Sequence, residues 1–322
     1  MQKTFKLHKR LLRTSMGALA TLVIFSSLAG LEPTVATAET ATPTPMPTSI
    51  TMAQYKTDLT AGLKTKLLPK NLNPSLDKAA APNFLYGTGC HAHMTQTVFP
   101  SDCTFGDVNG SSEIWLVGDS HAAQWFYALD AIAKEQHAKL IVHTKSSCEF
   151  ATGVVVNAKV HGPYNQCKIQ NDWWLSAIAE AKPNLVLVGA YYGLAAAQLA
   201  GLNNQLANLS RIAKNVVMLG DTPSQNGLAV DCLRAHLTNI QGCTVSISRA
   251  RPEVGAAIKE AAGKRGIAYF DAAKYLCLNG QCPSTVRNIM LYRDATHITS
   301  QAAMYLKDRL WMDLEPIWQR AN

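Results

Sequence analysis

Five short apolar runs alternate with longer amphipathic stretches from residue 114 to the end of the chain. The runs cover residues 114–118, 140–142, 185–188, 216–219 and 267–270, and the stretches cover 121–136, 171–181, 194–213, 252–264 and 299–311. Strands that alternate with helices form parallel sheets that carry helices on both faces. The pattern predicts an α/β fold with a parallel five-stranded sheet, in which functional groups gather at the carboxyl ends of the strands.

Two polar motifs, 174 residues apart, lie at such strand ends. Gly-Asp-Ser-His-Ala at 118–122 ends the first apolar run, and Asp-Ala-Thr-His at 294–297 precedes the last helical stretch. Ser120 supplies a nucleophile, His297 a base and Asp294 a group that orients the base. The alternative is that these residues only cap helices. The combination of both motifs favours catalysis by Ser120, His297 and Asp294, with His121 as a supporting or surface group.

The N-terminal 51 residues are typical of an export segment followed by a linker. A basic start without acids precedes an apolar stretch at about 16–31, and Ala-Thr-Ala at 36–38 fits a small-residue cleavage site. We expect a signal peptide over 1–38, because the apolar stretch is short for a full membrane span. The alternative is a retained membrane anchor. Residues 39–51 are predicted to be a Thr/Pro-rich linker. Either way the protein is expected to be secreted or held outside the cytoplasm.

Charge gives no support for nucleic-acid binding. The chain has 30 basic and 22 acidic residues, a net charge of +8, and removal of residues 1–38 leaves a mildly basic chain without a Lys/Arg block. Residues 52–88 are predicted to form an N-terminal arm with an amphipathic helix that carries Tyr55, Leu59, Leu63 and Leu67 on one side. The remaining residues, 89–322, are long enough for one domain with its own core, expected to be a monomer.

All eight cysteines lie after the export segment, where the compartment is oxidising. An even count in this setting indicates disulfides. Consecutive cysteines are 13, 19, 11 and 5 residues apart within pairs, against 45, 65 and 34 between pairs. A metal site is disfavoured because no two-residue Cys-x-x-Cys spacing occurs. We therefore predict four local bridges: Cys90–Cys103, Cys148–Cys167, Cys232–Cys243 and Cys277–Cys282.

The two motifs together resemble those of the SGNH (GDSL-like) hydrolases. The chain is most similar to the extracytoplasmic SGNH domain that is fused to acyltransferase-3 membrane proteins of bacteria. The likeness covers most of residues 55–310 and includes Leu68-Pro69, Asn73-Pro74, the Cys90 to Cys103 loop, Trp115 to His121, Lys145 to Cys148, Cys277 to Cys282, and Leu291 to His297.

The resemblance implies a three-layer α/β/α, flavodoxin-like sandwich with a Ser-His-Asp triad. It implies acylation or deacylation of hydroxyl groups on cell-envelope carbohydrate or glycolipid, with no metal and no bound cofactor. The leading expectation is O-acyl transfer, most simply of acetyl groups, through an acyl-enzyme on Ser120. The alternatives are a carbohydrate or acetyl esterase with the same triad, and a non-catalytic glycan-binding module.

Two departures from the family pattern bear on the chemistry. The Gly-x-Asn-Asp block, whose Asn completes the oxyanion hole, is replaced by Val-Gly-Ala-Tyr-Tyr at 188–192. The oxyanion is then expected to rely on the Ser120 N–H and on an N–H near Ser146 or Ser147, helped by Tyr191, which alternatively lines a sugar site. No multi-span membrane domain is visible, so a membrane acyltransferase is a possible partner that supplies acyl groups.

Overall fold

The computed structural model describes residues 50–98, 100, 102–154, 156–193 and 195–321. The expected signal peptide at 1–38, and the linker up to residue 49, lie outside these residues. Ile50 and Thr51, the end of the expected linker, are described. Ile50 is buried, and its N–H donates to the Asp308 carboxylate at 2.6 Å. In the part of the chain that the structure describes, no helix has the length and apolar character needed to cross a membrane.

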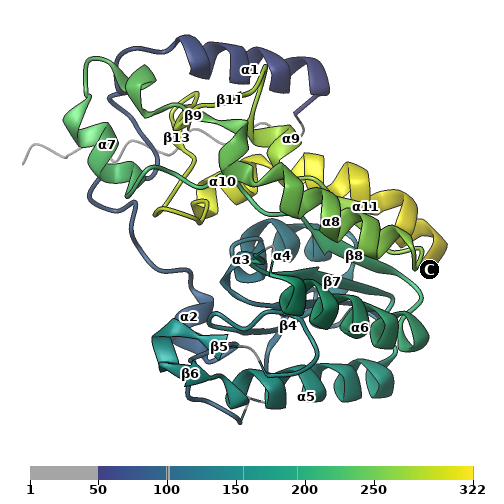
Figure 1. Ribbon diagram of the computed structural model, residues 1–322. Helices are drawn as coiled ribbons and strands as arrows, with labels where there is room; N and C mark the ends of the chain where they lie inside the picture. Colours follow the sequence, from purple (N-terminus) through teal and green to yellow (C-terminus); the bar gives the residue numbers. More distant parts are fainter. Residues whose placement is uncertain (1–49, 99, 101, 155, 194, 322) are drawn as a thin grey trace, which may run out of the picture. The chain divides into compact units, whose positions relative to one another are not determined.

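A seven-stranded sheet forms the centre of the fold (Figure 1). Six strands run in the order β1-β4-β3-β7-β8-β10 and are parallel, while β2 pairs with β4 in the antiparallel direction. The strands are β1 His91–Ala92, β2 Thr104–Gly106, β3 Ser112–Gly118, β4 Ala138–Lys145, β7 Leu185–Gly189, β8 Val216–Leu219 and β10 Ala268–Phe270. The parallel α/β prediction is confirmed.

The predicted strand count of five was too low. The sequence pattern missed β1 and β2 because each has only two or three residues, too few for a hydrophobic period to register. The Cys90–Cys103 disulfide joins the residues directly before these two strands, and both strands pair with β4. This bridge therefore holds the two short additions at one edge of the sheet.

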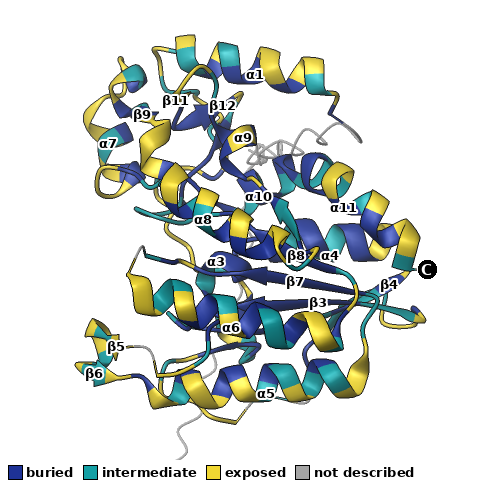
Figure 2. Ribbon diagram, turned by 45° about the vertical axis from the view of Figure 1, so that its right-hand side comes forward, coloured by how far each residue is buried: buried dark blue, intermediate teal, exposed yellow. Residues whose placement is uncertain are grey.

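Helices cover both faces of the sheet, as Figure 2 shows. One face packs against α3 Ser120–Ala123, α4 Phe126–Glu135, α10 Ser300–Tyr305 and α11 Lys307–Ala321. The other packs against α5 Asn165–Ala181, α6 Ala196–Ile212 and α8 Pro252–Gly263. Each face of the sheet carries its own hydrophobic core, and alternate residues of β3 belong to the two cores. Ile114 and Leu116 pack into the core of the first face, and Trp115 and Val117 pack into that of the second. The expected three-layer sandwich is present.

Two predicted helices are each divided in the structure. The stretch 121–136 forms α3 and α4 with a break at Gln124 and Trp125, and the stretch 299–311 forms α10 and α11. Gln124 is buried at its break, where its side chain donates to the His121 carbonyl and accepts from the Ile298 N–H. The break thus links the end of β3 to the loop before α10, where the second polar motif lies.

The N-terminal arm packs into the same core as the sheet. Its helix, α1 Met52–Lys64, buries Tyr55, Leu59 and Gly62, whereas Leu67 lies beyond the helix and is exposed. Gly62 lies so close to Thr285 that a Cβ there would come within 2.6 Å of the Thr285 carbonyl oxygen. The arm is therefore a packed part of the domain surface and is not a detached leader.

Smaller elements complete the described chain. They are α2 Leu85–Thr88, β5 Val156–Asn157, β6 Gly162–Pro163, α7 Ala229–Ala235, β9 Val245–Ser246, α9 Ala273–Leu276, β11 Gln281–Cys282, β12 Thr285–Val286 and β13 Ile289–Met290, with short 3₁₀ turns at Ala158–Val160, Ile240–Cys243 and Ile247–Ala250. All four predicted disulfides are formed, in the predicted pairs. None of the eight cysteines lies within a strand of the central sheet, so all four bridges join segments at its edge or outside it.

Candidate active site

Ser120 lies in a sharp turn between β3 and α3, at the carboxyl end of a central strand. Gly118 adopts φ +129°, and a Cβ there would come 1.8 Å from the Gly189 carbonyl oxygen of β7. Only glycine tolerates this approach and this dihedral angle. The buried Asp119 then accepts from the N–H groups of His121, at 2.7 Å, and Tyr191, at 3.0 Å. These contacts hold the turn in place and leave the Ser120 side chain partly exposed at the strand end.

A continuous chain of hydrogen bonds joins Asp294, His297 and Ser120. His297 Nε2 lies 2.8 Å from Ser120 Oγ, and His297 Nδ1 lies 2.9 Å from both carboxylate oxygens of Asp294. Asp294 also accepts from the N–H groups of Thr296 and His297 at 2.8 Å each, which closes a tight turn. The alternative capping role falls to another residue, because Thr299 caps α10. The structure thus brings together the three residues that the sequence singles out.

The electrostatics of this chain suit a neutral base beside a charged orienter. Burial raises the pKa of Asp294, but hydrogen bonds from His297 and from backbone N–H groups outweigh it, so the pKa lies well below its usual range. Burial lowers the pKa of His297, and the nearby His121 charge lowers it further, against the opposing pull of Asp294. His297 is therefore mostly uncharged at neutral pH and can accept a proton from Ser120 Oγ.

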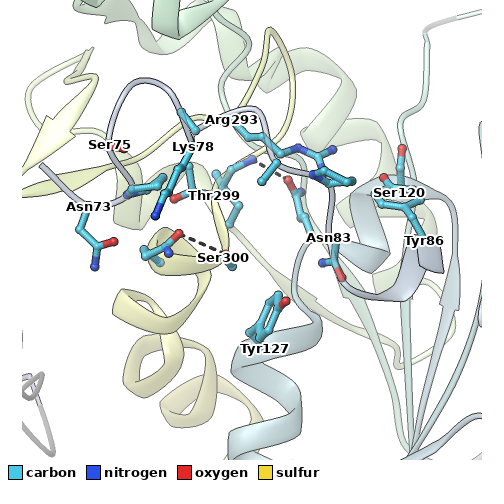
Figure 3. A pocket seen from close by; sticks show the side chains of 17 residues that line it. Asn73, Ser75, Lys78, Asn83, Tyr86, Ser120, Tyr127, Arg293, Thr299 and Ser300 are labelled. Atoms are coloured by element: carbon cyan, nitrogen blue, oxygen red, sulfur yellow. Dashed lines mark hydrogen bonds between the residues drawn. The ribbon is translucent and has the colours of Figure 1, made fainter. Parts of the chain in front are cut away.

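Two cavities meet at Ser120. The first, of about 380 Å³, is called here the strand-end cavity, and its lining residues are Asp119, Ser120, His121, Ser147, Glu149, Asn157, Lys159, Tyr191, Thr296 and His297. The second, of about 470 Å³, is called the arm cavity (Figure 3). More than half of its lining residues come from residues 73–86 of the arm, and the rest come from α3, the break at Gln124, α4 and the segment 293–301.

Comparison with models of known families identifies the domain that carries these residues. Residues 89–311 match the profile of the SGNH domain (fused to AT3 domains). The chain belongs to this family. It is an enzyme of the acyltransferase and esterase class that the family comprises. A search of curated proteins found no match.

Comparison with solved structures gives one match at the level of the fold and weaker similarities to other proteins. The periplasmic domain of a lipopolysaccharide acetyltransferase from Salmonella ser. Paratyphi A is 18% identical, with a TM-score of 0.58 over 76% of this chain and 96% of that chain. A catalytic mutant of an acetylxylan esterase from Geobacillus stearothermophilus is 11% identical, with a TM-score of 0.38 over 65% of this chain and 96% of that one. An α/β hydrolase from the metagenome of Lake Arreo, Spain, is 14% identical, with a TM-score of 0.39 over 65% and 97%.

The three residues expected to serve the oxyanion differ in their position relative to the strand-end cavity. Ser147 lines the strand-end cavity at φ +52°. Tyr191 also lines it, although its own N–H is taken by Asp119. Ser146 is not among the residues that line the cavity, and its N–H donates to the Ala92 carbonyl of β1 at 2.9 Å. Within the described ranges, the N–H groups of Ser120 and Ser147 have no hydrogen-bond acceptor, so two backbone donors are free at this site.

A buried ionic cluster beside the triad was missed by sequence reasoning. His121 Nδ1 lies 2.6 Å from Asp221 Oδ1, and Arg251 lies 2.5 Å from the other Asp221 oxygen. The Arg251 guanidinium also stacks on the Tyr191 ring at 3.8 Å and donates to the Tyr192 carbonyl. Asp221 lies two residues after the end of β8, and a carboxylate close behind a predicted strand was the signal that could have revealed it. The cluster fixes both His121 and the Tyr191 ring beside Ser120.

Glu149 and Lys159 also line the strand-end cavity, and neither was anticipated. Burial raises the pKa of Glu149 to about 7. Its Oε1 accepts from Gln198 at 2.6 Å, while its Oε2 has no partner in the described part of the chain. Lys159 donates to Ser147 Oγ at 3.2 Å. The Cys148–Cys167 disulfide, which the sequence predicted, anchors the segment that carries these residues. It therefore helps to hold this wall of the cavity in place.

One group of residues away from the site has the spacing of metal ligands but is accounted for by a disulfide. Cys232, His236 and Cys243 place their ligand atoms within 4.8 Å of one another. Cys232 and Cys243 are joined in a disulfide, so neither sulfur is available as a thiolate ligand. This cluster therefore carries no metal chemistry in the oxidised protein.

Proposed function

We propose that the protein is an O-acyltransferase that moves an acyl group, most simply acetyl, onto hydroxyl groups of a cell-envelope glycan or glycolipid. The observation that carries the proposal is the unbroken hydrogen-bond chain from Asp294 through His297 to Ser120. Membership of a family described as fused to AT3 domains supports acyl chemistry linked to a membrane. The acetyltransferase domain from Salmonella shares the fold.

The first half of the proposed reaction forms an acyl-enzyme. His297 Nε2 takes the proton of Ser120 as Oγ attacks the ester carbonyl of the donor, and Asp294 stabilises the imidazolium that forms. The free N–H groups of Ser120 and Ser147 are proposed to bind the oxyanion, in place of the family's Asn donor. Collapse of the tetrahedral intermediate breaks the donor ester bond, and His297 returns the proton to the leaving alcohol.

The second half transfers the acyl group. An acceptor hydroxyl gives its proton to His297 and attacks the acyl carbon, and the Ser120 Oγ–acyl bond breaks as Ser120 recovers the proton. Water in place of the acceptor gives the alternative function, an esterase with the same residues. Transfer is favoured over hydrolysis because two cavities open on one nucleophile, and an enzyme with two substrates needs more than one binding region.

The proposed cellular setting lies outside the cytoplasm. Acyl-CoA is a cytosolic donor, so an exported transferase needs a membrane acyltransferase partner or an extracellular ester as its acyl source. Four disulfides in the described chain agree with an oxidising compartment. The N-terminal export segment and its cleavage after residue 38 belong to this proposal, as does a division into arm and SGNH domain near residue 89.

Release of 4-nitrophenol from 4-nitrophenyl acetate by the full chain tests the proposed nucleophile. We expect Ser120→Ala to lower this rate by at least about 1,000-fold. The matched control is Ser210→Ala on α6, whose exposed hydroxyl donates to the Ala207 carbonyl of the same helix at 3.1 Å. A serine-reactive phosphonate should label the wild type at Ser120. Turnover that survives in Ser120→Ala, without labelling of Ser120, would overturn both the transferase and the esterase.

Sugar acceptors added to the same assay separate the two enzymatic functions. Transfer predicts acetylated sugar, identified by mass spectrometry, at the expense of free acetate. Free acetate alone with every acceptor would instead establish the esterase.

A further inference from the structure

The arm cavity ends at Ser120, but more than half of its lining lies outside the family domain. Figure 3 shows Asn73, Ser75 and Lys78 at one end and Ser120 at the other. The family match begins at residue 89, so the wall formed by residues 73–86 belongs to the arm of this chain. A volume of about 470 Å³ falls within the range of about 300–1,000 Å³ that is usual for ligand pockets.

The arm is fixed on both sides of this cavity. At one end the Asn73 N–H donates to the Asn288 carbonyl at 2.6 Å, and the Asn73 carbonyl accepts from Met290 at 3.0 Å. At the other end the Asn83 side chain donates to the Ala123 carbonyl of α3 at 2.9 Å. Pro74 and Ala79 are buried between these two anchors. The cavity wall is thus held by the hydrogen bonds and packing of the arm.

The polar groups of the arm cavity fall into two sets. The side chains of Asn83 and Gln124 form hydrogen bonds with backbone groups of the protein. In contrast, the side-chain polar atoms of five residues have no hydrogen-bond or ion-pair partner within the described chain. These residues are Asn73, Ser75, Lys78, Tyr86 and Tyr127. An amide, three hydroxyls and an ammonium group are therefore available to a ligand.

The charge of the cavity is positive. Its lining contains Lys78 and Arg293 and no Asp or Glu. Arg293 lies 3.3 Å from the Asp294 carboxylate, which offsets its charge. Lys78 has no such partner among the residues described, and Asp77 beside it in sequence is paired with Arg234 at 2.8 Å. A ligand that fills this cavity gains most if it carries an anionic group near Lys78 and hydroxyls near the uncharged donors.

We propose that the arm cavity is the acceptor subsite and that it binds a glycan bearing a carboxylate or phosphate group, with Lys78 as the ion-pair partner of that group. This inference rests on the acyltransferase function proposed above. The acceptor hydroxyl attacks the acyl carbon on Ser120, and its proton passes to His297 and then to Ser120 Oγ. The acyl group and its oxyanion occupy the strand-end cavity, where the free N–H groups of Ser120 and Ser147 lie.

Acceptor selectivity tests the proposal in the full chain. Acetyl transfer from 4-nitrophenyl acetate is measured to an oligomer of uronic acids and to the same oligomer with its carboxyl groups reduced to alcohols. We expect the wild type to favour the acidic acceptor and Lys78→Glu to lower the acidic-to-neutral ratio about tenfold. The ratio is measured within one sample, so partial loss of folded protein does not affect it.

The matched control is Lys56→Glu, which makes the same charge change on the exposed side of α1. Lys56→Glu should leave the acidic-to-neutral ratio at the wild-type value. An equal fall of this ratio in both variants would show that the effect comes from the overall charge of the protein, and would overturn the role of Lys78. A wild-type ratio near one, or an unchanged ratio in Lys78→Glu, would overturn the anionic subsite.

Binding separates this proposal from the proposed function. If the acyl group passes only to water, the transferase fails, and titration of Ser120→Ala with the acidic oligomer then decides the subsite alone. Saturable binding that weakens about tenfold in Ser120→Ala/Lys78→Glu supports an anionic glycan site on an esterase. Absence of binding, or binding that does not depend on Lys78, overturns it. Inorganic phosphate as a competitor reports whether phosphate shares the site with carboxylate.

Discussion

The imidazole rings of His121 and His297 lie side by side, with their centroids 4.5 Å apart. His121 Nδ1 contacts the Asp221 carboxylate, while His297 Nε2 contacts Ser120 Oγ. Burial lowers the pKa of His121, but the carboxylates of Asp221, Asp119 and Asp294 outweigh it and raise the pKa above its usual value. The fold therefore places a histidine that tends to carry charge against His297, the proposed base, which must be neutral to accept a proton.

Replacement of His121 should move the acid limb of the pH–rate profile. Besides burial, His121 and Arg293 lower the pKa of His297, while Asp294 raises it. In His121→Gln the lowering by His121 is lost, so the pKa of His297 rises and the base stays protonated to a higher pH. We expect the lower midpoint of the kcat/KM profile with 4-nitrophenyl acetate to shift to higher pH. A midpoint that stays in place would show that His121 carries no charge beside His297.

Replacement of Asp221 should destabilise the protein in a pH-dependent way. Asp221→Asn leaves Arg251 and His121 without their buried carboxylate, which costs about 3–5 kcal/mol in comparable pairs. Despite burial, His121 and Arg251 lower the pKa of Asp221, so this stabilisation is present above about pH 4 and is lost as pH falls through the folded-state value. The raised pKa of His121 adds stability below about pH 6.5 that is lost as pH rises through its folded-state value.

Denaturant unfolding of the wild type and Asp221→Asn at a series of pH values measures this effect. The difference in unfolding free energy should be largest between about pH 4 and 6.5 and smaller on both sides. A difference independent of pH would mean that the pair contributes through packing alone.

Replacement of Asp294 should affect the rate far more than the fold. Asn keeps an oxygen that accepts from the N–H groups of Thr296 and His297, so the turn can persist. The amide stabilises the imidazolium less and favours the wrong tautomer of His297, which lowers kcat by about 10³- to 10⁴-fold in comparable triads. Circular dichroism and thermal unfolding should stay close to the wild type. A loss of only a few-fold in kcat would remove Asp294 from the proposed triad.

A methyl group at Gly118 should prevent correct folding of the β3–α3 turn. The added Cβ would meet the Gly189 carbonyl oxygen at 1.8 Å, so the two central strands would have to separate. We expect Gly118→Ala to lower the free energy of unfolding by more than about 4 kcal/mol.

Gly153→Ala is the matched control, because Gly153 also has positive φ, at +85°, but nothing lies within 4 Å of the added atom. It should cost only about 1–2 kcal/mol from backbone strain. Equal losses in the two variants would show that the dihedral angle, and not the contact with β7, requires glycine at position 118.

The sequence predicted the parts of the fold that repeat a simple pattern. Strands such as β3 and β7 are buried on both faces and appear as unbroken apolar runs, which are easy to recognise. β1 and β2 have no such run, since their places at the sheet edge depend on pairing with β4 and on the Cys90–Cys103 bridge. The breaks within the predicted helices arise from tertiary contacts such as those of Gln124, which no local pattern records.

The candidate site divides in the same way. Ser120, Asp294 and His297 stand in short motifs whose chemistry is visible in the sequence, and the structure brings them together. Asp221 and Arg251 are 30 residues apart, outside any motif, and their relation to His121 depends on the order of strands in the sheet. Ser146 was an expected oxyanion residue, but the register of β1 against β4 occupies its N–H.

The position of the arm has a consequence for how such enzymes diversify. The proposed reacting groups lie at the ends of the sheet, whereas more than half of the larger cavity wall lies on a segment that precedes the family domain and is anchored at Asn73 and Asn83. Under the proposed acceptor subsite, exchange of residues 73–86 between related chains would alter which acceptor is modified while the chemistry of modification stays the same. Acceptor choice and turnover would then be encoded in separate stretches of the gene.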